Sequence, residues 1–542
     1  MNDVELLRDA LAHAARSLGA PSDVAPIVER PRDPSFGDWT TNLALTLAKP
    51  LGKKPRDIAT ALIAALDLSA LHVAAAEIAG AGFINFRMHQ AALARGLAAI
   101  IAEGDGYGKS DVGHGQRVMV EFVSANPTGP LHVGHGRQAA LGDAISRLLE
   151  WTGWDVSREF YYNDAGVQID NLTASVQALV RGQPVPEKGY HGEYIKEIAA
   201  EYSAAYPGDP LAGNADQVRQ FGVRVLRGEQ DRDLQAFGVY FDTYYLESSL
   251  YIDGSVERTL AALKASGYTY EDGGALKLRT TAFGDDLDRV IIKRDGTNTY
   301  VVPDIAYHVG KWQRGFQRVI NIHGADHVGY WARVRAGLQM MGEGIPEGWP
   351  EYVIHDLVKV ARGGEEVRMS KRAGSYVTLQ DLLEWVGRDA VRYFFLMRRY
   401  VSDLTFDVDL AQRQSDENPV YYVQMAHARM CGIFRVGGID KDELRVEAEA
   451  LDALSAPEEL ELIKALLDFP DIVESAAQAL EPQRITAYLH ETAQLAHHWY
   501  HKYHVLGEPE PVQSARLALA RATQLVLRNA MTLLGIHAPE RM

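Results

Sequence analysis

Apolar side chains recur along this chain with two different periods. Arg117–Val123 is a short, almost unbroken apolar run, which is typical of a parallel strand that is buried on both faces. After a turn rich in glycine and proline, leucine and isoleucine recur at helical spacing until Gly153. Trp154–Tyr162 then forms a second strand pattern. The order of strand, helix and strand predicts an α/β fold with a Rossmann-like, doubly wound parallel sheet.

Further strands are predicted downstream. Arg318–His323 reads as another buried strand. Arg289–Arg294 and Thr299–Val302 flank D-G-T-N, which is a hairpin signal. Tyr352–Ala361 and Glu366–Met369 flank a tight R-G-G-E turn.

The length of 542 residues is too great for one core and suggests about three domains. We expect an N-terminal α+β domain over residues 1–110, followed by a glycine-rich linker. The α/β domain spans residues 116–385, with helical and polar segments at about 170–275 that form an insertion across one face of the sheet. Residues 386–542 are expected to form an all-α bundle, because long apolar-periodic helices replace strands from about residue 410.

Composition favours a globular protein of a reducing compartment. Hydrophobic residues make up 47% of the chain and charged residues 23%, which are ordinary values. No apolar run approaches the eighteen or so residues that span a bilayer, and the first residues lack a signal-peptide pattern, so we expect no membrane association. The single cysteine, Cys431, excludes an intrachain disulfide framework and fits the cytoplasm.

The net charge of −17 argues against a general polyanion binder. It does not exclude nucleic acid, because binding depends on local clusters of Lys and Arg. Two candidate clusters are Arg368, Lys371 and Arg372, and Arg392, Arg398 and Arg399. For each of these residues, a solvated helix face is an equally good interpretation.

The segment A-N-P-T-G-P-L-H-V-G-H at 125–135 follows the first strand and opens the first helix. His132 and His135 therefore lie near a helix N-terminus, where unpaired N–H groups and the helix dipole favour a phosphate. Gly134 has no Cβ, so a base or ribose could approach the backbone closely. Taken alone, H-x-x-H is more often an ordinary polar pair or a metal site. A zinc site would need further ligands, so we expect no zinc.

M-S-K-R-A-G at 369–374 places Lys371 in a loop far downstream. Together the two segments resemble the paired signatures of class I aminoacyl-tRNA synthetases, known as HIGH and KMSKS. Within that class the chain resembles the arginyl-tRNA synthetase family. The resemblance is carried by S-A-N-P-T-G-P-L-H-V-G-H (124–135), Y-Y-N-D-A-G-V-Q-I (161–169), G-R-D-A-V-R-Y-F (387–394), N-P-V-Y-Y-V-Q-M-A-H-A-R (418–429) and L-L-G-I-H-A-P-E-R-M (533–542).

This resemblance implies an arginine–tRNA ligase, which activates L-arginine with ATP and transfers it to the terminal adenosine of tRNA. It further implies that the N-terminal domain touches the tRNA elbow and that the helical bundle holds the anticodon stem. Mg²⁺ is expected with ATP, held mostly by phosphates and water. We expect a monomer.

Adenylate formation needs no enzyme nucleophile, so catalysis depends on positioning and charge stabilisation. The predicted catalytic residues are His132 and His135, which donate to the α-phosphate, and Lys371, which follows the pyrophosphate from a mobile loop. Arg368 and Arg372 replace the first lysine and the usual serine of the second signature. The predicted ATP contacts are His132, Gly134, His135, Asp326, His327, Met369, Ser370 and Lys371.

Arginine recognition needs carboxylates that face the guanidinium group. By resemblance, Tyr300, Asp304 and Glu121 contact the guanidinium, and Glu121 is also unusual as a charge within an apolar run. Asp304 could instead cap a helix after Pro303. The residues expected at the α-amino and carboxylate groups are Ser124, Asn126 and His132, with His327 where the family often has glutamine.

Three other functions compete with this interpretation. Glutamyl and lysyl enzymes of class I share the fold, but A-P-E-R-M and the Tyr300/Asp304 pair favour arginine, and a cysteinyl enzyme would need zinc-binding cysteines. A non-catalytic tRNA-binding paralogue should lack a signature residue, yet His132, His135 and Lys371 are present. A small-molecule nucleotidyltransferase would leave the helical C-terminal domain without a purpose.

Overall fold

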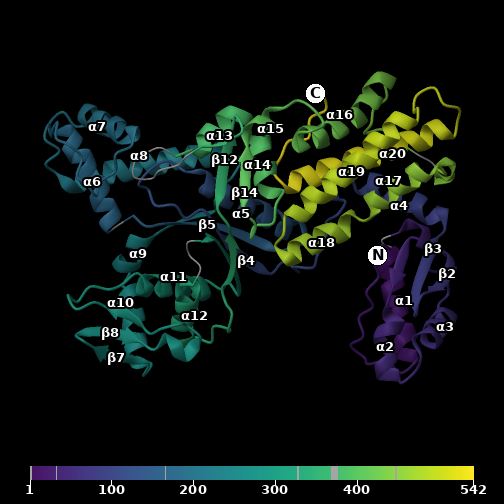
Figure 1. The fold of residues 1–542 in the computed structure, drawn as a ribbon, viewed down its shortest axis with the longest axis horizontal. Coiled ribbons are helices and arrows are strands. Elements are labelled where there is room, and N and C mark those ends of the chain that lie inside the picture. Colours follow the sequence, from purple (N-terminus) through teal and green to yellow (C-terminus); the bar gives the residue numbers. More distant parts are fainter. Residues whose placement is uncertain (1–2, 32, 165, 326–328, 368–375, 446–447) are drawn as a thin grey trace.

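The computed structural model describes residues 3–542, except residues 32, 165, 326–328, 368–375 and 446–447. The molecule is elongated (Figure 1). An α/β unit lies at one end, and a helical bundle lies between it and a small N-terminal unit. The predicted α/β class, with an α+β N-terminal domain and an all-α C-terminal bundle, is confirmed.

A five-stranded parallel sheet forms the centre of the α/β unit, in the order β11-β10-β4-β5-β6. Its strands are β4 (Arg117–Glu121), β5 (Asp155–Tyr162), β6 (Thr243–Leu246), β10 (Arg318–Gly324) and β11 (Glu351–His355). Both faces of β4 are buried, because Val118 and Val120 pack into one core and Met119 into another. This double burial explains the unbroken apolar run in the sequence.

Helices cover both faces of the sheet, as the doubly wound prediction requires. α5 (Val133–Trp151) packs into the first core, whereas α11 (Val301–Gln313) and α12 (Tyr330–Met340) pack into the second. Since all five strands are parallel, their carboxyl ends lie along one edge of the sheet. That edge carries the cavity described below.

Three helices between β5 and β6 share a small core of their own. They are α6 (Val167–Val180), α7 (Glu193–Ala205) and α8 (Ala215–Ala236). We predicted helical and polar segments over residues 170–275, but two strands also lie inside that range. β7 (Thr269–Asp272) belongs to the small sheet described next. β6 pairs with β5, with Glu159 opposite Thr243. The strand was missed because T-Y-Y-L is only four residues long and half-buried.

A small antiparallel sheet follows, made of β7 (Thr269–Asp272), β8 (Ala275–Leu278) and β9 (Arg289–Ile292). Two short helices, α9 (Glu247–Ile252) and α10 (Ser255–Ala265), precede it. The predicted turn at D-G-T-N is confirmed, since the Lys293 N–H donates to the Thr297 carbonyl at 2.8 Å. The predicted second arm, Thr299–Val302, does not form a strand, because α11 begins at Val301. Its pairing with β9 is limited to a bridge between Ile292 and Asn298 and a hydrogen bond from the Thr299 N–H to the Ile291 carbonyl at 3.0 Å.

The strand predicted at Tyr352–Ala361 is two strands that belong to different sheets. β11 ends at His355, and β12 (Val358–Arg362) joins a second small sheet. The tight turn after β12 is confirmed, with positive φ at Gly363 and Gly364. The elements that complete this region are β13 (Glu365–Glu366), β14 (Leu404–Asp407), α13 (Leu379–Val386), α14 (Arg388–Leu396) and α15 (Val408–Gln412).

The N-terminal unit has its own core. Its elements are α1 (Asp3–Ser17), β1 (Trp39–Thr41), α2 (Leu43–Leu51), α3 (Pro55–Ala65), β2 (Val73–Ala79) and β3 (Phe83–Met88). Ion pairs fasten this unit to the bundle: Arg30 contacts Asp468 at 2.8 Å, and Lys464 contacts Asp38 at 2.5 Å. α4 (Gln90–Glu103) then leads away and packs against the bundle helices α17 and α20.

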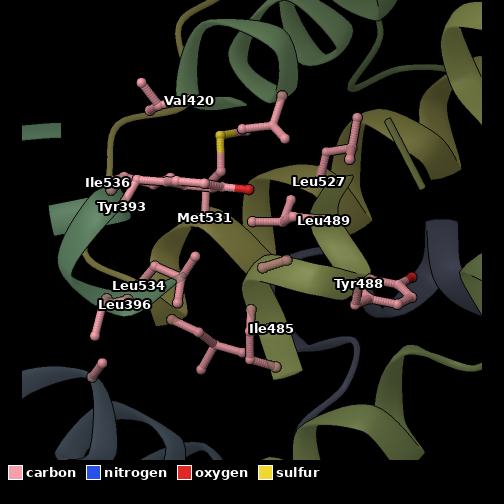
Figure 2. Close-up of a cluster of buried hydrophobic side chains, with 14 of the residues drawn as sticks. Tyr393, Leu396, Val420, Ile485, Tyr488, Leu489, Leu527, Met531, Leu534 and Ile536 are labelled. Atoms are coloured by element: carbon pink, nitrogen blue, oxygen red, sulfur yellow. The ribbon is translucent and has the colours of Figure 1, made fainter. Parts of the chain in front are cut away.

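The C-terminal bundle is helical, as predicted, and the last described strand ends at Asp407. Its helices are α16 (Pro419–Gly437), α17 (Pro457–Leu467), α18 (Phe469–Ala479), α19 (Gln483–Lys502) and α20 (Val512–Leu533). The bundle shares one continuous core with the first face of the sheet. Figure 2 shows where α14 joins it, with Tyr393 beside Met531 and Leu396 beside Leu534. Among the helices of the described residues, none is both long and apolar enough to cross a membrane.

Candidate functional site

A cavity of about 800 Å³ lies at the carboxyl edge of the five-stranded sheet. Residues from the ends of β4, β5, β10 and β11 line it, together with residues of α5 and α11. The structure therefore brings together predicted site residues that are up to 183 positions apart. Those that line the cavity are Glu121, Ser124, Asn126, His132, Gly134, His135, Tyr300 and Asp304.

The two histidines form the N-terminal cap of α5. The His132 Nδ1 accepts hydrogen bonds from the backbone N–H groups of Gly134 and His135, at 3.1 and 3.4 Å. The His135 Nδ1 accepts one from the His132 N–H at 3.3 Å, and the rings stack with centroids 3.7 Å apart. Because both Nδ1 atoms accept, a neutral ring carries its proton on Nε2. Both rings therefore have a donor nitrogen for an anion at this helix end.

The His132 ring leaves no room for a side chain at Gly134. A Cβ at this position would lie 2.9 Å from the Cε1 atom of His132. Any other residue would therefore push the His132 ring away from its capping position. The structure thus gives the glycine a role in holding the histidine pair, in addition to the open approach predicted for a nucleotide.

The segment after the second predicted motif returns to the histidine pair. The Val133 N–H donates to the Val377 carbonyl at 3.2 Å, and the Leu379 N–H donates to the Leu131 carbonyl at 2.8 Å. Tyr376 lines the cavity and lies edge-on to His132 at 6.2 Å. The predicted residues Asp326, His327, Arg368, Met369, Ser370, Lys371 and Arg372 lie outside the described residues.

Glu121 ends β4 and is 4% exposed. Its Oε2 accepts a hydrogen bond from Lys311 at 2.5 Å, and its Oε1 accepts one from the Ser124 hydroxyl at 2.9 Å. Burial raises the pKa of Glu121, but the charge and hydrogen bond of Lys311, together with His323 and His308, outweigh burial and lower that pKa to about 2. Glu121, the charged residue noted within the apolar run, is therefore ionised and paired with Lys311 inside the protein.

Asp304 lies in the first turn of α11, and Tyr300 precedes the helix. The side chain of Tyr300 is 62% exposed at the cavity rim. The Tyr330 hydroxyl donates to the Asp304 carboxylate. Burial, with Glu247 and Glu121 nearby, raises the pKa of Asp304 to about 7 despite that hydrogen bond. Asp304 does not cap the helix, because Tyr300 occupies the N-cap position.

Glu247 is a cavity residue that sequence reasoning missed. It begins α9 directly after β6, is 7% exposed and lines the cavity. The Tyr161 hydroxyl donates to its Oε2 at 2.9 Å, and burial raises the pKa of Glu247. An acidic residue directly after T-Y-Y-L could have been noticed in the sequence. Its significance depends on β6, which had not been identified.

Asn126 and Ser124 lie on a turn with unusual backbone geometry. Val123 and Ser124 have φ values of 68° and 41°, in the left-handed region that β-branched residues rarely adopt. The Asn126 amide donates to Gln168 of α6 at 2.7 Å. Gln230 of α8 donates to the carbonyls of Asn126 and Gly129, at 3.1 and 2.9 Å. The helices between β5 and β6 therefore support this loop.

A second cavity, of about 480 Å³, lies on the bundle between α16, the end of α19 and the C-terminal residues. Three arginines line it, Arg429, Arg435 and Arg541, together with the rings of Tyr500 and Tyr503. The chain end is fastened there, since His427 contacts the Pro539 carbonyl at 2.8 Å. Guanidinium groups beside aromatic rings are suited to an unstacked nucleotide base and its phosphate.

Within the described part of the chain, no three His, Cys, Asp or Glu side chains are grouped so that they could hold a metal ion.

Three family models match consecutive parts of the chain. The N-terminal domain of arginyl tRNA synthetase matches residues 5–88, and the catalytic domain of class I (R) tRNA synthetases matches residues 97–394. The DALR anticodon binding domain matches residues 423–542.

Similar proteins extend these matches over the whole chain. The arginine--tRNA ligase of Thiobacillus denitrificans is 50% identical, covering 100% of both chains. That of Bordetella petrii is 52% identical over 95% of both chains. The solved structure of Thermus thermophilus arginyl-tRNA synthetase is 25% identical with a TM-score of 0.77, covering 99% of this chain and 100% of its own. The chain therefore belongs to the arginyl-tRNA synthetase family.

Proposed function

The chain is an arginine–tRNA ligase, and we propose that the sheet-edge cavity is where it joins L-arginine to ATP and passes the arginine to tRNA. One observation supports this most directly. Two carboxylates, the half-buried Asp304 and the buried Glu247, share a cavity with the histidine pair at the N-terminus of α5. The carboxylates suit a guanidinium group, and the helix end suits a phosphate.

ATP is the substrate that the histidine pair is suited to bind. The Nε2–H groups of His132 and His135 donate to the α-phosphate and to the departing oxygen, while Gly134 keeps the His132 ring in place. An oxygen of the arginine carboxylate attacks the α-phosphorus in line, and pyrophosphate leaves. Mg²⁺ would come with ATP, held mostly by phosphates and water. The proposed further ATP contacts are Asp326, His327, Met369, Ser370 and Lys371.

Arginine would be held at both ends. Asp304, Glu247 and the Tyr300 hydroxyl form the guanidinium site, and Glu121 lies in the same cavity. Ser124, Asn126 and His132, with His327, are proposed to contact the α-amino and carboxylate groups. A substrate without the guanidinium would leave both carboxylates without a positively charged partner, so discrimination of about 10⁴–10⁵ is attainable.

The tRNA would contact all three parts of the molecule. The arginine-lined second cavity and the match to an anticodon binding domain support the bundle as the anticodon site. The N-terminal unit, fastened beside the bundle by Arg30 and Lys464, is proposed to reach the tRNA elbow. We further propose a cytoplasmic monomer.

Pyrophosphate exchange with each of the twenty amino acids, with and without tRNA, tests this function. We expect exchange with arginine that requires tRNA. Exchange with another amino acid would overturn the specificity. No exchange with any amino acid, even with tRNA present, would favour a non-catalytic tRNA-binding paralogue.

A further inference from the structure

A buried lysine lies directly behind the proposed arginine site. The side chain of Lys311, on α11, is 0% exposed. Its Nζ donates to Glu121 Oε2 at 2.5 Å and to Asn321 Oδ1 at 3.0 Å. Lysine is rarely buried unless it is paired. This ammonium group therefore has a specific partner in Glu121, whose carboxylate would otherwise be a buried, unpaired charge.

A chain of hydrogen bonds through Asn321 and His308 holds Lys311 in place. The Asn321 amide nitrogen contacts His308 Nε2 at 2.8 Å, and His308 Nδ1 contacts the Asp304 carbonyl at 2.8 Å. A carbonyl can only accept, so Nδ1 carries the proton and Nε2 accepts from Asn321. Asn321 Oδ1 is then the acceptor for Lys311. Burial lowers the pKa of His308 to about 3, so this ring stays neutral and the direction of the chain is fixed.

The pair of Glu121 and Lys311 also contacts the strained turn at Val123 and Ser124, through a hydrogen bond between Ser124 and Glu121. Glu121 Oε1 accepts from the Ser124 hydroxyl at 2.9 Å, and Ser124 follows Val123 in the left-handed backbone region. Such geometry persists only where the surroundings determine it strongly. The Ser124 oxygen also accepts from the Tyr161 N–H at 3.3 Å. The turn is thus tied to β5 and, through Glu121, to Lys311.

We propose that Lys311 is a positioning residue for arginine: through Glu121, it holds the turn at Val123 and Ser124 so that Ser124 and Asn126 meet the amino-acid end of the substrate. Glu121 is neutralised by a resident cation. Selectivity for the substrate's positive charge therefore comes from Asp304 and Glu247, and Glu121 acts through Ser124. This inference rests on the proposed function.

The test replaces Lys311 with methionine, which keeps an unbranched side chain, one atom shorter, and removes the ammonium. Arginine KM in pyrophosphate exchange should rise at least tenfold, whereas ATP KM should stay within twofold. Lys196→Met is the matched control, because Lys196 forms an exposed pair with Glu193 on α7, and it should change neither constant. A thermal melt of each variant checks that the protein is folded.

A double variant separates positioning from general destabilisation. Glu121→Gln/Lys311→Met removes both charges of this buried pair. The glutamine side-chain oxygen can still accept a hydrogen bond from the Ser124 hydroxyl. Arginine KM should therefore return to within about threefold of the wild-type value. This variant also remains informative if Lys311→Met alone does not fold.

Three results would overturn the inference. These are an arginine KM within twofold of wild type in a folded Lys311→Met variant, an equal rise in both KM values, or a folded double variant whose arginine KM stays more than tenfold raised. A wild-type protein that gives no arginine-dependent exchange would instead overturn the proposed function.

Discussion

At the scale of single residues, charge balance determines how the cavity can bind a cation. Glu121 is balanced by Lys311, whereas the carboxylates of Asp304 and Glu247 receive hydrogen bonds only from tyrosine hydroxyls among the bonds described above. Burial raises the pKa of both Asp304 and Glu247, and that of Asp304 is about 7, so the Asp304 carboxyl is partly protonated at neutral pH in the empty cavity. A guanidinium group would supply the missing positive charge. If arginine binds there as proposed, its binding is coupled to proton release from Asp304.

The pH dependence of arginine affinity follows from Asp304. Its pKa is about 7 in the empty cavity, and a bound guanidinium lowers that pKa. Arginine affinity should therefore increase as pH rises toward 7 and level off above it, by up to about tenfold per unit below pH 7. Isothermal titration with arginine at pH 6, 7 and 8 measures this. A flat profile would mean that Asp304 does not ionise on binding.

Asp304→Asn removes the titrating group and one carboxylate of the guanidinium site. Truncating one partner of a buried charge pair costs about 2–5 kcal/mol, so arginine KM should rise at least about thirtyfold. ATP KM should be nearly unchanged. The pH dependence should also disappear, which a general loss of stability would not cause.

Glu247→Gln tests the carboxylate that the sequence did not reveal. The Tyr161 hydroxyl can still donate to the amide oxygen, so the variant should fold. Arginine KM should rise by a similar factor to that of Asp304→Asn, again with ATP KM unchanged. Asp253→Asn, an exposed change just beyond α9, is the control and should have no effect. A normal arginine KM in Glu247→Gln would remove Glu247 from the site.

At the scale of elements, the sequence predicted what depends on local periodicity. β4, α5 and β10 were identified because each buries a continuous apolar run or an apolar face. β6 was missed because its four residues are only half-buried. The pairing of Glu121 with Lys311 joins residues 190 positions apart, and no local pattern reports that contact. The division of Tyr352–Ala361 into two strands likewise depends on which sheet each half joins.

Gln230 shows how one element supports another. This residue of α8 is 1% exposed and donates to two carbonyls in the loop between β4 and α5. Gln230→Ala would leave both carbonyls without that donor, at a cost of about 1–3 kcal/mol. We expect kcat/KM for pyrophosphate exchange to fall about fivefold or more, with the fold intact.

The matched control is Gln235→Ala on the same helix. Gln235 contacts only Asp231 at the surface among its described hydrogen bonds, so its loss should leave exchange unchanged. Equal effects of the two substitutions would show that α8 acts through its overall stability. Equal effects would therefore contradict a specific role of Gln230 in supporting the loop between β4 and α5.

At the scale of the whole molecule, the parts are joined in two different ways. The bundle and the α/β unit share one continuous hydrophobic core, so they should move as one body (Figure 2). The N-terminal unit has a separate core and meets the bundle through charged side chains. Interfaces of that kind permit relative motion more readily than a shared core. A substitution at the charged interface should therefore displace the N-terminal unit more easily than a substitution in the shared core would displace the bundle.

Arg30 is the residue whose loss should displace that unit. Its guanidinium lies 3.8 Å from the centre of the Trp39 ring and contacts both oxygens of Asp468. Arg30→Ala removes these contacts and leaves Asp468, whose pKa is raised by burial, without its main cation. If the N-terminal unit contacts tRNA, the tRNA KM should rise about threefold to tenfold. The KM values for arginine and ATP should not change, because the sheet-edge cavity is remote from this interface.

Arg16→Ala, at the exposed end of α1, is the control and should leave the tRNA KM unchanged. An unchanged tRNA KM in Arg30→Ala would mean that tRNA binding does not depend on how this unit is docked.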